Sequence, residues 1–220
     1  MLRHLRTRTG PALAGLLCLL GCVSCQRSSA DLPAPDDDVD LGPVPPFALT
    51  ERDGRTVTDK DLRGKVWLAS FVFTRCNGPC PQVAATLTQL QSEFAGRPDV
   101  RLVTFTVDPE HDGPRELDEY AARYRADPKR WLFLTGKADD LSTLVNKGFH
   151  IFAQPNTGAE RQPGREVQHQ TRLAVVDRRG HIRGYFEGLR DPRWDDPEAE
   201  FQKNLQRLRQ KLEALLREAP

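Results

Sequence analysis

The sequence predicts an α/β fold in which a mixed central sheet carries helices on both faces. Three observations indicate this class. Apolar runs of strand length alternate with amphipathic stretches of helix length between residues 66 and 145, and a hairpin pattern stands at each end of that region. The chain has no internal repeat. Because strand–helix–strand connections give parallel neighbours and hairpins give antiparallel ones, the sheet should be mixed.

The expected strands are short and mostly apolar. The Asp53-Gly54 pair favours a tight turn between residues 47–50 and 56–58, so a β-hairpin should open the domain. Residues 66–73 form a nearly unbroken apolar run, as expected for a central strand covered on both faces. The remaining strands are expected at 100–107, 131–134, 172–176 and 182–186, the last two as a closing hairpin.

Four stretches show the three- and four-residue spacing of amphipathic helices. The first follows the cysteine segment and carries Val83, Leu87, Leu90 and Phe94. The others span 117–124, 141–145 and 201–215, and the last has its large apolar side chains on one stripe. Each helix should bury its apolar stripe against the sheet. The polar stretch 154–168 shows no such pattern.

The folded domain is expected to span residues 47–220. A basic stretch and a short apolar run that ends in small residues make residues 1–21 a signal peptide for export. The apolar run has roughly 15 residues, short of the ~20 that a spanning helix needs, so a transmembrane leader is the less favoured anchor. The residues up to Cys22 resemble the bacterial lipoprotein signal, which would make Cys22 the lipidated N-terminus. Residues 22–46, rich in Pro and Asp, should form a disordered tether.

The charge balance and the motifs argue against several classes of protein. The 32 Lys and Arg and the 31 Asp and Glu nearly cancel, which argues against a nucleic-acid binder. Motifs of the GxGxxG, P-loop, HExxH and GxSxG types are absent from the sequence. The expected location is the periplasmic side of a bacterial cell envelope, with the domain anchored to the membrane by the lipid or by an uncleaved leader.

Cys76 and Cys80 carry the clearest chemical signal. They stand where a buried strand meets a helix, the place where sites collect in open α/β sheets, and Pro81 marks the first helical position. The helix N-terminus should make both thiols more acidic. A CxxxC spacing places the two sulfurs at i and i+4 on one helical face, from which both can point at one ion. Two thiolates favour Cu(I) or zinc, with a third ligand from elsewhere.

His169 is the preferred third ligand among the five histidines. It directly precedes the strand at 172–176, in the loop expected to return to the cysteine end of the sheet. The other histidines have simpler explanations: His4 is in the leader, His111 in a charged loop, His150 packed beside an apolar segment and His181 in a turn.

Three separated segments together resemble the Sco/SenC family of copper proteins. The first is Phe71-Val-Phe-Thr-Arg-Cys-Asn-Gly-Pro-Cys-Pro81, similar to the family's strand followed by CxxxCP. The second, Thr106-Val-Asp-Pro-Glu-His-Asp-Gly-Pro114, resembles a strand that ends in Asp-Pro. The third, Gln168-His-Gln-Thr-Arg-Leu-Ala-Val-Val-Asp177, resembles the segment in which a histidine precedes the last strands. The order and spacing match from about residue 44 onward.

This resemblance implies a thioredoxin-like fold and a role in the assembly of cytochrome c oxidase. Cys76, Cys80 and His169 would be ligands of copper, as Cu(I), Cu(II) or both, and Asp108 would support the site. The copper would go to the copper-bearing subunit of the oxidase, with other copper chaperones or a thiol reductant as further candidate partners. The chain departs from the family's common residues at Asn77, where proline is usual, and also at Gly113 and Gln170.

Two other interpretations of the cysteine pair remain open. An exported domain permits a stabilising disulfide, although a loop of five residues removes little chain entropy. A thioredoxin-like thiol–disulfide oxidoreductase or peroxidase could act through Cys76 and Cys80. Ordinary thioredoxins have a proline just before the strand that faces the cysteines, and residues 169–173 contain none. Copper delivery and thiol chemistry are compatible, because both need reduced sulfurs.

Overall fold

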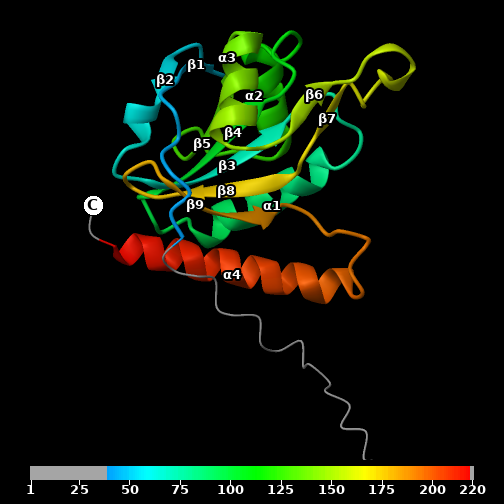
Figure 1. Ribbon diagram of the computed structural model, residues 1–220. Coiled ribbons are helices and arrows are strands. Elements are labelled where there is room, and N and C mark those ends of the chain that lie inside the picture. The colour runs from blue at the N-terminus through cyan, green and yellow to red at the C-terminus, as the bar shows by residue number, and fades with distance from the viewer. Residues whose placement is uncertain (1–38, 219–220) are drawn as a thin grey trace, which may run out of the picture. The chain divides into compact units, whose positions relative to one another are not determined.

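The computed structural model of the chain describes residues 39–218 and has a mixed sheet at its centre (Figure 1). The strand order is β2-β1-β5-β4-β3-β8-β9. Strands β3, β4 and β5 are parallel, whereas β1, β2, β8 and β9 pair in antiparallel fashion. Their bounds are β1 Ala48–Glu51, β2 Thr56–Thr58, β3 Val66–Val72, β4 Val100–Thr106, β5 Trp131–Thr135, β8 Arg172–Val176 and β9 Ile182–Glu187.

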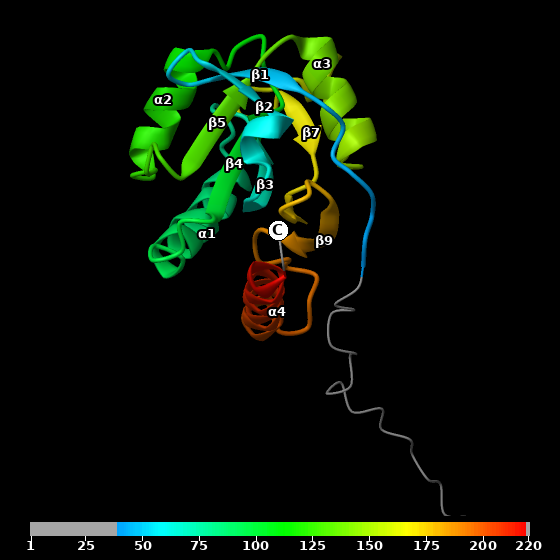
Figure 2. The ribbon, with the colours of Figure 1, turned by 90° about the vertical axis from the view of Figure 1, so that its left-hand side faces the viewer.

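Helices cover both faces of this sheet, as predicted. Helices α1 (Cys80–Glu93), α2 (Pro114–Arg123) and α4 (Pro197–Arg217) share one core with the sheet. Helix α3 (Ala138–Thr143), its π-helical continuation η2 (Leu144–Gly148) and the 3-10 turn η1 (Asp59–Leu62) pack on the other face. Figure 2 shows α1 and α2 on one side of the sheet and α3 on the other. The predicted α/β class with a mixed sheet is confirmed.

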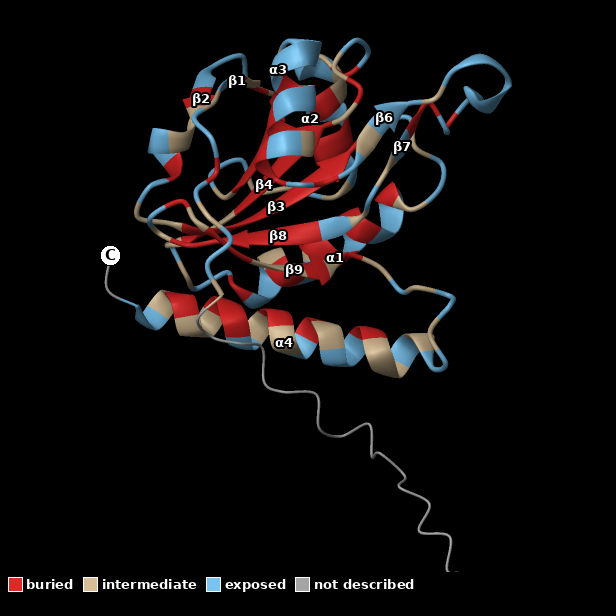
Figure 3. Ribbon diagram, in the orientation of Figure 1, coloured by how far each residue is buried: buried red, intermediate tan, exposed pale blue. Residues whose placement is uncertain are grey.

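Strand β3 explains how the two cores are separated. All seven of its residues are buried, and alternate side chains point to opposite faces of the sheet. Leu68 and Val72 pack in the core of α1 and α4, while Trp67 and Phe71 pack in the core of α3. Figure 3 shows the buried residues concentrated on the sheet and on the inner stripes of the helices.

A second, two-stranded sheet lies in the polar stretch that showed no sequence pattern. Strand β6 (Ala153–Pro155) pairs antiparallel with β7 (Val167–His169), and the 3-10 turn η3 (Gly158–Glu160) lies between them. We call residues 156–166 the arm; in Figure 1 it extends from β6 and β7 beyond the main sheet. Strands of three residues with few apolar side chains give too little periodicity to be recognised, so this hairpin was missed.

Residues 39–46, placed in the tether by the sequence analysis, instead pack on the domain. This segment, which we call the strap, runs beside β9: Leu41 N–H donates to Ile182 O and Val44 N–H to Gly180 O, each at 2.9 Å. Val44 is only 3% exposed. The composition of the strap suggested a disordered linker, but its backbone forms hydrogen bonds with residues at the β8–β9 turn. The remainder of the predicted tether, the predicted signal peptide and Cys22 lie outside the described residues.

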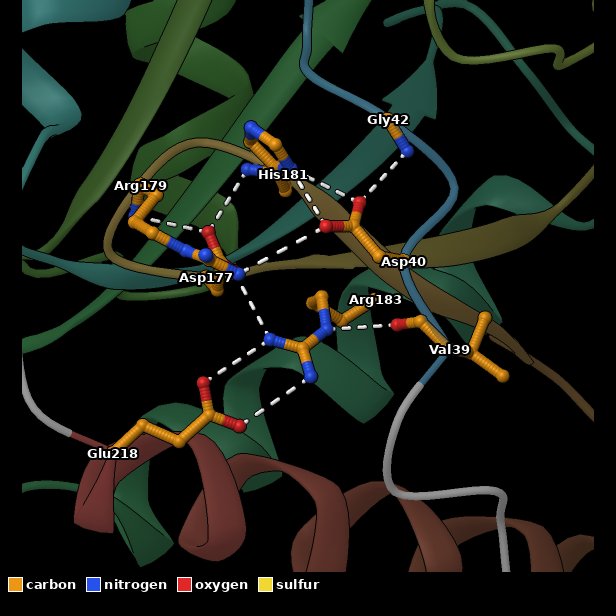
Figure 4. Close-up of polar contacts among 8 residues, drawn as sticks. All are labelled: Val39, Asp40, Gly42, Asp177, Arg179, His181, Arg183 and Glu218. Atoms are coloured by element: carbon orange, nitrogen blue, oxygen red, sulfur yellow. Dashed lines mark hydrogen bonds and ion pairs between the residues drawn. The ribbon is translucent and has the colours of Figure 1, made fainter.

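Charged side chains hold the start of the strap in place (Figure 4). Asp40 accepts hydrogen bonds from Gly42 N–H at 2.9 Å and contacts His181 Nδ1 through both carboxylate oxygens. Arg183 donates from Nε to Val39 O at 2.7 Å and from Nη1 to Asp177 and Glu218. The strap, the β8–β9 turn and the end of α4 are thereby joined at one end of the sheet. Among the described residues, no helix combines the length and the apolar character needed to cross a membrane.

Candidate functional site

The three predicted ligands come together at the edge of the sheet where β3 and β4 end. Cys76 lies in the turn after β3, Cys80 is the first residue of α1 and His169 is the last residue of β7. Because β8 runs antiparallel to β3, the β7–β8 connection returns to that same edge. Residues 89 positions apart in sequence, Cys80 and His169, thereby approach to 3.5 Å between Sγ and Nε2.

The two cysteines do not share a helical face, contrary to the expectation from their spacing. Cys76 lies in a turn, where its own N–H donates to Phe73 O at 3.2 Å. The helix begins only at Cys80. Proline disfavours the helical conformation in the residue before it, so Pro79 favours a start of the helix after Gly78. Cys76 is therefore partly exposed, whereas Cys80 is fully buried. Both thiols are free.

His169 presents one ring nitrogen to the sulfurs. Its Nδ1 lies 2.9 Å from its neighbour's carbonyl, Gln170 O. A carbonyl only accepts hydrogen bonds, so Nδ1 carries a hydrogen, and in the neutral form of the ring Nε2 has the lone pair, on the side of Cys80. The ring also packs edge-on against Phe73, with the centroids 5.8 Å apart. A backbone carbonyl that sets the tautomer of a histidine is the usual support for a metal ligand.

The two thiols differ sharply in acidity. A hydrogen bond from the Cys80 thiol is the main reason that the pKa of Cys76 falls to about 4; contacts with His169 and with the N–H groups of Cys80 and Gly78 add to it, against the effect of burial. The neighbouring thiolate and burial raise the pKa of Cys80. The expectation that both thiols would be more acidic is therefore wrong for Cys80, since two adjacent thiols share one proton and the buried one keeps it.

The donors form a hydrogen-bonded set rather than an open chelate. In the part of the chain that the structure describes, no three His, Cys, Asp or Glu side chains converge closely enough to hold a metal ion as they stand. Cys80 Sγ and His169 Nε2 are already 3.5 Å apart, and Cys76 lies close enough to both residues for them to lower its pKa. One imidazole nitrogen and two sulfurs are the donor types that suit copper.

Asp108 contacts Arg75 in the cysteine turn. It is buried, and its Oδ2 lies 2.6 Å from Nη2 of Arg75, the residue before Cys76. The other guanidinium nitrogen, Nη1, lies 3.4 Å from Glu166 Oε1 at the base of the arm. Asp108 therefore reaches the cysteine turn through Arg75, and its supporting role stays a prediction.

Asp112 is the site residue that the sequence analysis did not single out. It is completely buried and accepts hydrogen bonds from Thr74 N–H at 2.9 Å, Thr74 Oγ1 at 2.6 Å and Thr106 Oγ1 at 2.7 Å. These bonds join the ends of β3 and β4 directly before the cysteine turn. An aspartate in a polar loop resembles a solvent-exposed one, so only the proximity of the two strand ends reveals its role.

Sequence comparison relates this chain to a known family of proteins. The sequence profile of the SCO1/SenC family matches residues 39–199, most of the chain. The chain belongs to the SCO1/SenC family. The match begins with the strap, which agrees with a folded unit that starts near residue 39.

Members of the SCO1/SenC family from Bacillus are similar over most of their length. The SCO1 protein homologue of Bacillus subtilis (strain 168) is 34% identical over 155 residues, 70% of this chain and 78% of the relative. The structure of BsSco, described with a disulfide switch, is 32% identical, with a TM-score of 0.59 over 75% of this chain and 95% of that one. A SCO1/SenC family lipoprotein from Bacillus anthracis str. Ames is 27% identical, with a TM-score of 0.63 over 76% of this chain and 98% of that one. Their shared fold is the predicted thioredoxin-like one.

The SCO1/SenC site opens onto an irregular hollow. A space of about 720 Å³ lies between the cysteine turn and the arm, and both Cys76 and His169 line it. Cys80 lies beneath and does not line it. An incoming group therefore meets Cys76 and His169 first.

The three other described histidines lie outside the donor set. His111 contacts Asp112 at 3.0 Å, and His181 holds the strap. His150 is exposed, with a backbone φ of 50°, and is not packed against the apolar segment as expected. The two residues that flank it, Phe149 and Ile151, are buried instead, so the chain reverses at His150 and turns its side chain outward.

Proposed function

We propose that this protein is a copper metallochaperone that binds one copper through Cys76, Cys80 and His169 and delivers it to the copper-bearing subunit of a cytochrome c oxidase. The observation that carries the proposal is the approach of Cys80 Sγ to His169 Nε2 at 3.5 Å, with Cys76 near enough to both for its pKa to fall. BsSco, which shares this fold, is described as a member of the Sco family of cytochrome c oxidase assembly proteins.

The protonation states support binding of a soft metal ion. Cys76 is ionised at neutral pH and needs no proton removed, and the contact of Nδ1 with Gln170 O leaves Nε2 as the His169 atom that faces the sulfurs. Cys80 keeps its proton until the metal displaces it. Copper binding therefore releases the Cys80 proton, and copper affinity falls as the pH falls.

The unequal burial of the donors supports delivery by ligand exchange. Cys76 and His169 line the hollow, while Cys80 is fully buried. A sulfur or imidazole donor of the acceptor can therefore replace Cys76 or His169 while Cys80 still holds the copper. Exchange of one ligand at a time avoids release of the free ion.

Thiol chemistry is the second candidate function, favoured by the same acidic thiol. An ionised Cys76 beside the thiol of Cys80 can attack a partner's disulfide, after which Cys80 displaces the partner's thiol. The balance is two thiols oxidised to one disulfide and one partner disulfide reduced to two thiols. The disulfide switch described for BsSco supports this reaction, which would also remove both sulfur ligands from copper.

The anchor is also part of the proposal. We infer that residues 1–21 are a signal peptide, that Cys22 carries lipid and that the domain works at the membrane on the periplasmic side of the envelope. The description of the Bacillus anthracis relative as a lipoprotein supports a membrane-anchored, exported protein. Mass spectrometry of the mature N-terminus tests this: an unmodified peptide that begins elsewhere would rule out lipidation.

Copper stoichiometry and affinity test the donor set. We expect one tightly bound copper in the native chain, a large loss of affinity in His169→Ala and no change in the matched control His150→Ala, whose side chain is exposed. Undiminished binding in His169→Ala would remove His169 from the site. Copper transfer to an oxidase copper-site fragment, compared with reduction of a disulfide in that fragment, separates the two candidate functions.

A further inference from the structure

Arg75 joins the three segments that build the donor set. It directly precedes Cys76, and its guanidinium contacts Asp108 after β4 at 2.6 Å and Glu166 before β7 at 3.4 Å. The side chains of Asp108 and Glu166 are only 6% and 7% exposed. A planar guanidinium that presents two nitrogens to two carboxylates fixes direction as well as distance, which a lysine does not.

Glu166 depends on this contact. Among the described residues, Arg75 is the ion-pair partner of Glu166. The second carboxylate oxygen of Glu166, Oε2, is buried without a hydrogen bond. A buried carboxylate that loses its cation must regain water, because an unpaired charge is costly to keep buried. The base of the arm would then have to move outward, and His169 follows Glu166 by only three residues.

A second contact holds the arm on the other side of Cys76. Asn77 donates from its backbone N–H to Gly164 O and from Nδ2 to Pro163 O, both at 3.3 Å. Gly164 has a φ of 80°, and a Cβ there would lie 2.3 Å from Asn77 Cγ. A proline at position 77 could donate neither bond. The departure from the family's usual residue therefore coincides with an arm that is fastened to the cysteine turn on both sides of Cys76.

We propose that Arg75 is a positioning residue for the copper site, which acts through Glu166 to hold His169 against Cys76 and Cys80. The inference rests on the proposed donor set and adds a residue that touches none of the sulfurs. Arg75 keeps the cysteine turn and the arm at a constant separation, so that His169 Nε2 stays within reach of the thiols. Without Arg75, the two cysteines remain as ligands and the histidine contribution is lost.

The test measures Cu(I) affinity of the full reduced chain by competition with a chromophoric Cu(I) chelator. Arg75→Met removes both contacts, Arg75→Lys keeps the charge without the fork and Glu166→Gln keeps the shape of the acceptor. The matched control is Arg172→Met, since Arg172 pairs with Glu187 at the same edge of the sheet without joining the ligand segments. Loss of a supporting partner of a metal ligand lowers metal affinity by about 10- to 100-fold. We expect this for Arg75→Met, a smaller loss for the two milder variants and none for the control.

A double-variant cycle separates positioning from general destabilisation. If Arg75 acts through His169, Arg75→Met lowers affinity in the native background but adds little in the His169→Ala background. The nitrogen hyperfine pattern in the electron paramagnetic resonance spectrum of the Cu(II) form should also weaken in Arg75→Met. Equal losses in both backgrounds, or an unchanged affinity in Arg75→Met and Glu166→Gln, would overturn the inference. Wild-type affinity in His169→Ala would instead overturn the donor set itself.

Discussion

The acidity of Cys76 makes a sharp prediction about alkylation. In the reduced, metal-free protein, the rate at which iodoacetamide modifies Cys76 should stay constant between about pH 6 and pH 8, because a thiol with a pKa of about 4 is fully ionised throughout. The rate of an ordinary cysteine rises about tenfold for each pH unit over that range, since only its thiolate reacts.

The size of the effect follows from two opposing factors. At about pH 6 a thiol with the ordinary pKa of 9.0 is roughly 0.1% ionised, so Cys76 has about a thousandfold more thiolate. Each unit by which the pKa falls also slows the thiolate about threefold, which over about five units removes a factor of roughly 200. Cys76 should therefore react about fivefold faster than a free cysteine near pH 6 and about twentyfold slower near pH 8.

Peptide mass spectrometry of the alkylated chain follows each cysteine separately. Cys80 is the internal comparison, because its raised pKa and its burial should leave it unmodified. The same chain in concentrated urea provides the unfolded reference, in which both thiols should show the ordinary pH dependence. A Cys76 rate that climbs tenfold per pH unit in the folded protein would refute the reasoning.

Two further predictions concern stability. Asp112→Asn should lower the free energy of unfolding by about 2–4 kcal/mol, because an amide nitrogen then faces the buried donors of Thr74 and Thr106. Urea denaturation measures this free energy, and an unchanged midpoint would contradict the role of Asp112. Asp40→Asn should cost about 0.2–1 kcal/mol near neutral pH, since this carboxylate is partly exposed. The folded-state pKa of Asp40 is lowered by the Gly42 N–H and by His181, so its contribution is present above its unfolded pKa and disappears as the pH falls through the folded one. If the urea midpoints of the native chain and the variant differ by the same amount at acid and at neutral pH, the result counts against the strap contact.

Much of the fold was predictable because the signals are local. The apolar run at 66–73 appeared as the buried strand β3, and the stripe at 201–215 appeared within helix α4. The hairpin β6–β7 was missed, since three-residue strands with polar side chains owe their pairing to position and not to pattern. The strap was missed for a related reason: its backbone hydrogen bonds are made to Gly180 and Ile182, which no feature of residues 39–46 indicates.

The sequence predicted where the two cysteines lie in the fold but not how their side chains are arranged. The sequence placed Cys76 and Cys80 at a strand–helix junction, and the structure has them there. The spacing suggested one helical face, but Pro79 delays the helix until Cys80, so one sulfur is partly exposed and the other buried. The difference in their acidity follows from this placement and not from the helix end alone.

By itself the sequence determined the alternation of strands and helices, the cysteine pair and the histidine segment that resembles a known family. These are properties of neighbouring residues, and periodicity or spacing carries them. Only the tertiary structure decided that Arg75 would contact Asp108 and Glu166, that Asp112 would join two strand ends, and which thiol would keep the proton. Such contacts depend on distances between segments far apart in the chain and on burial, and both exist only once the sheet has brought the segments to one edge.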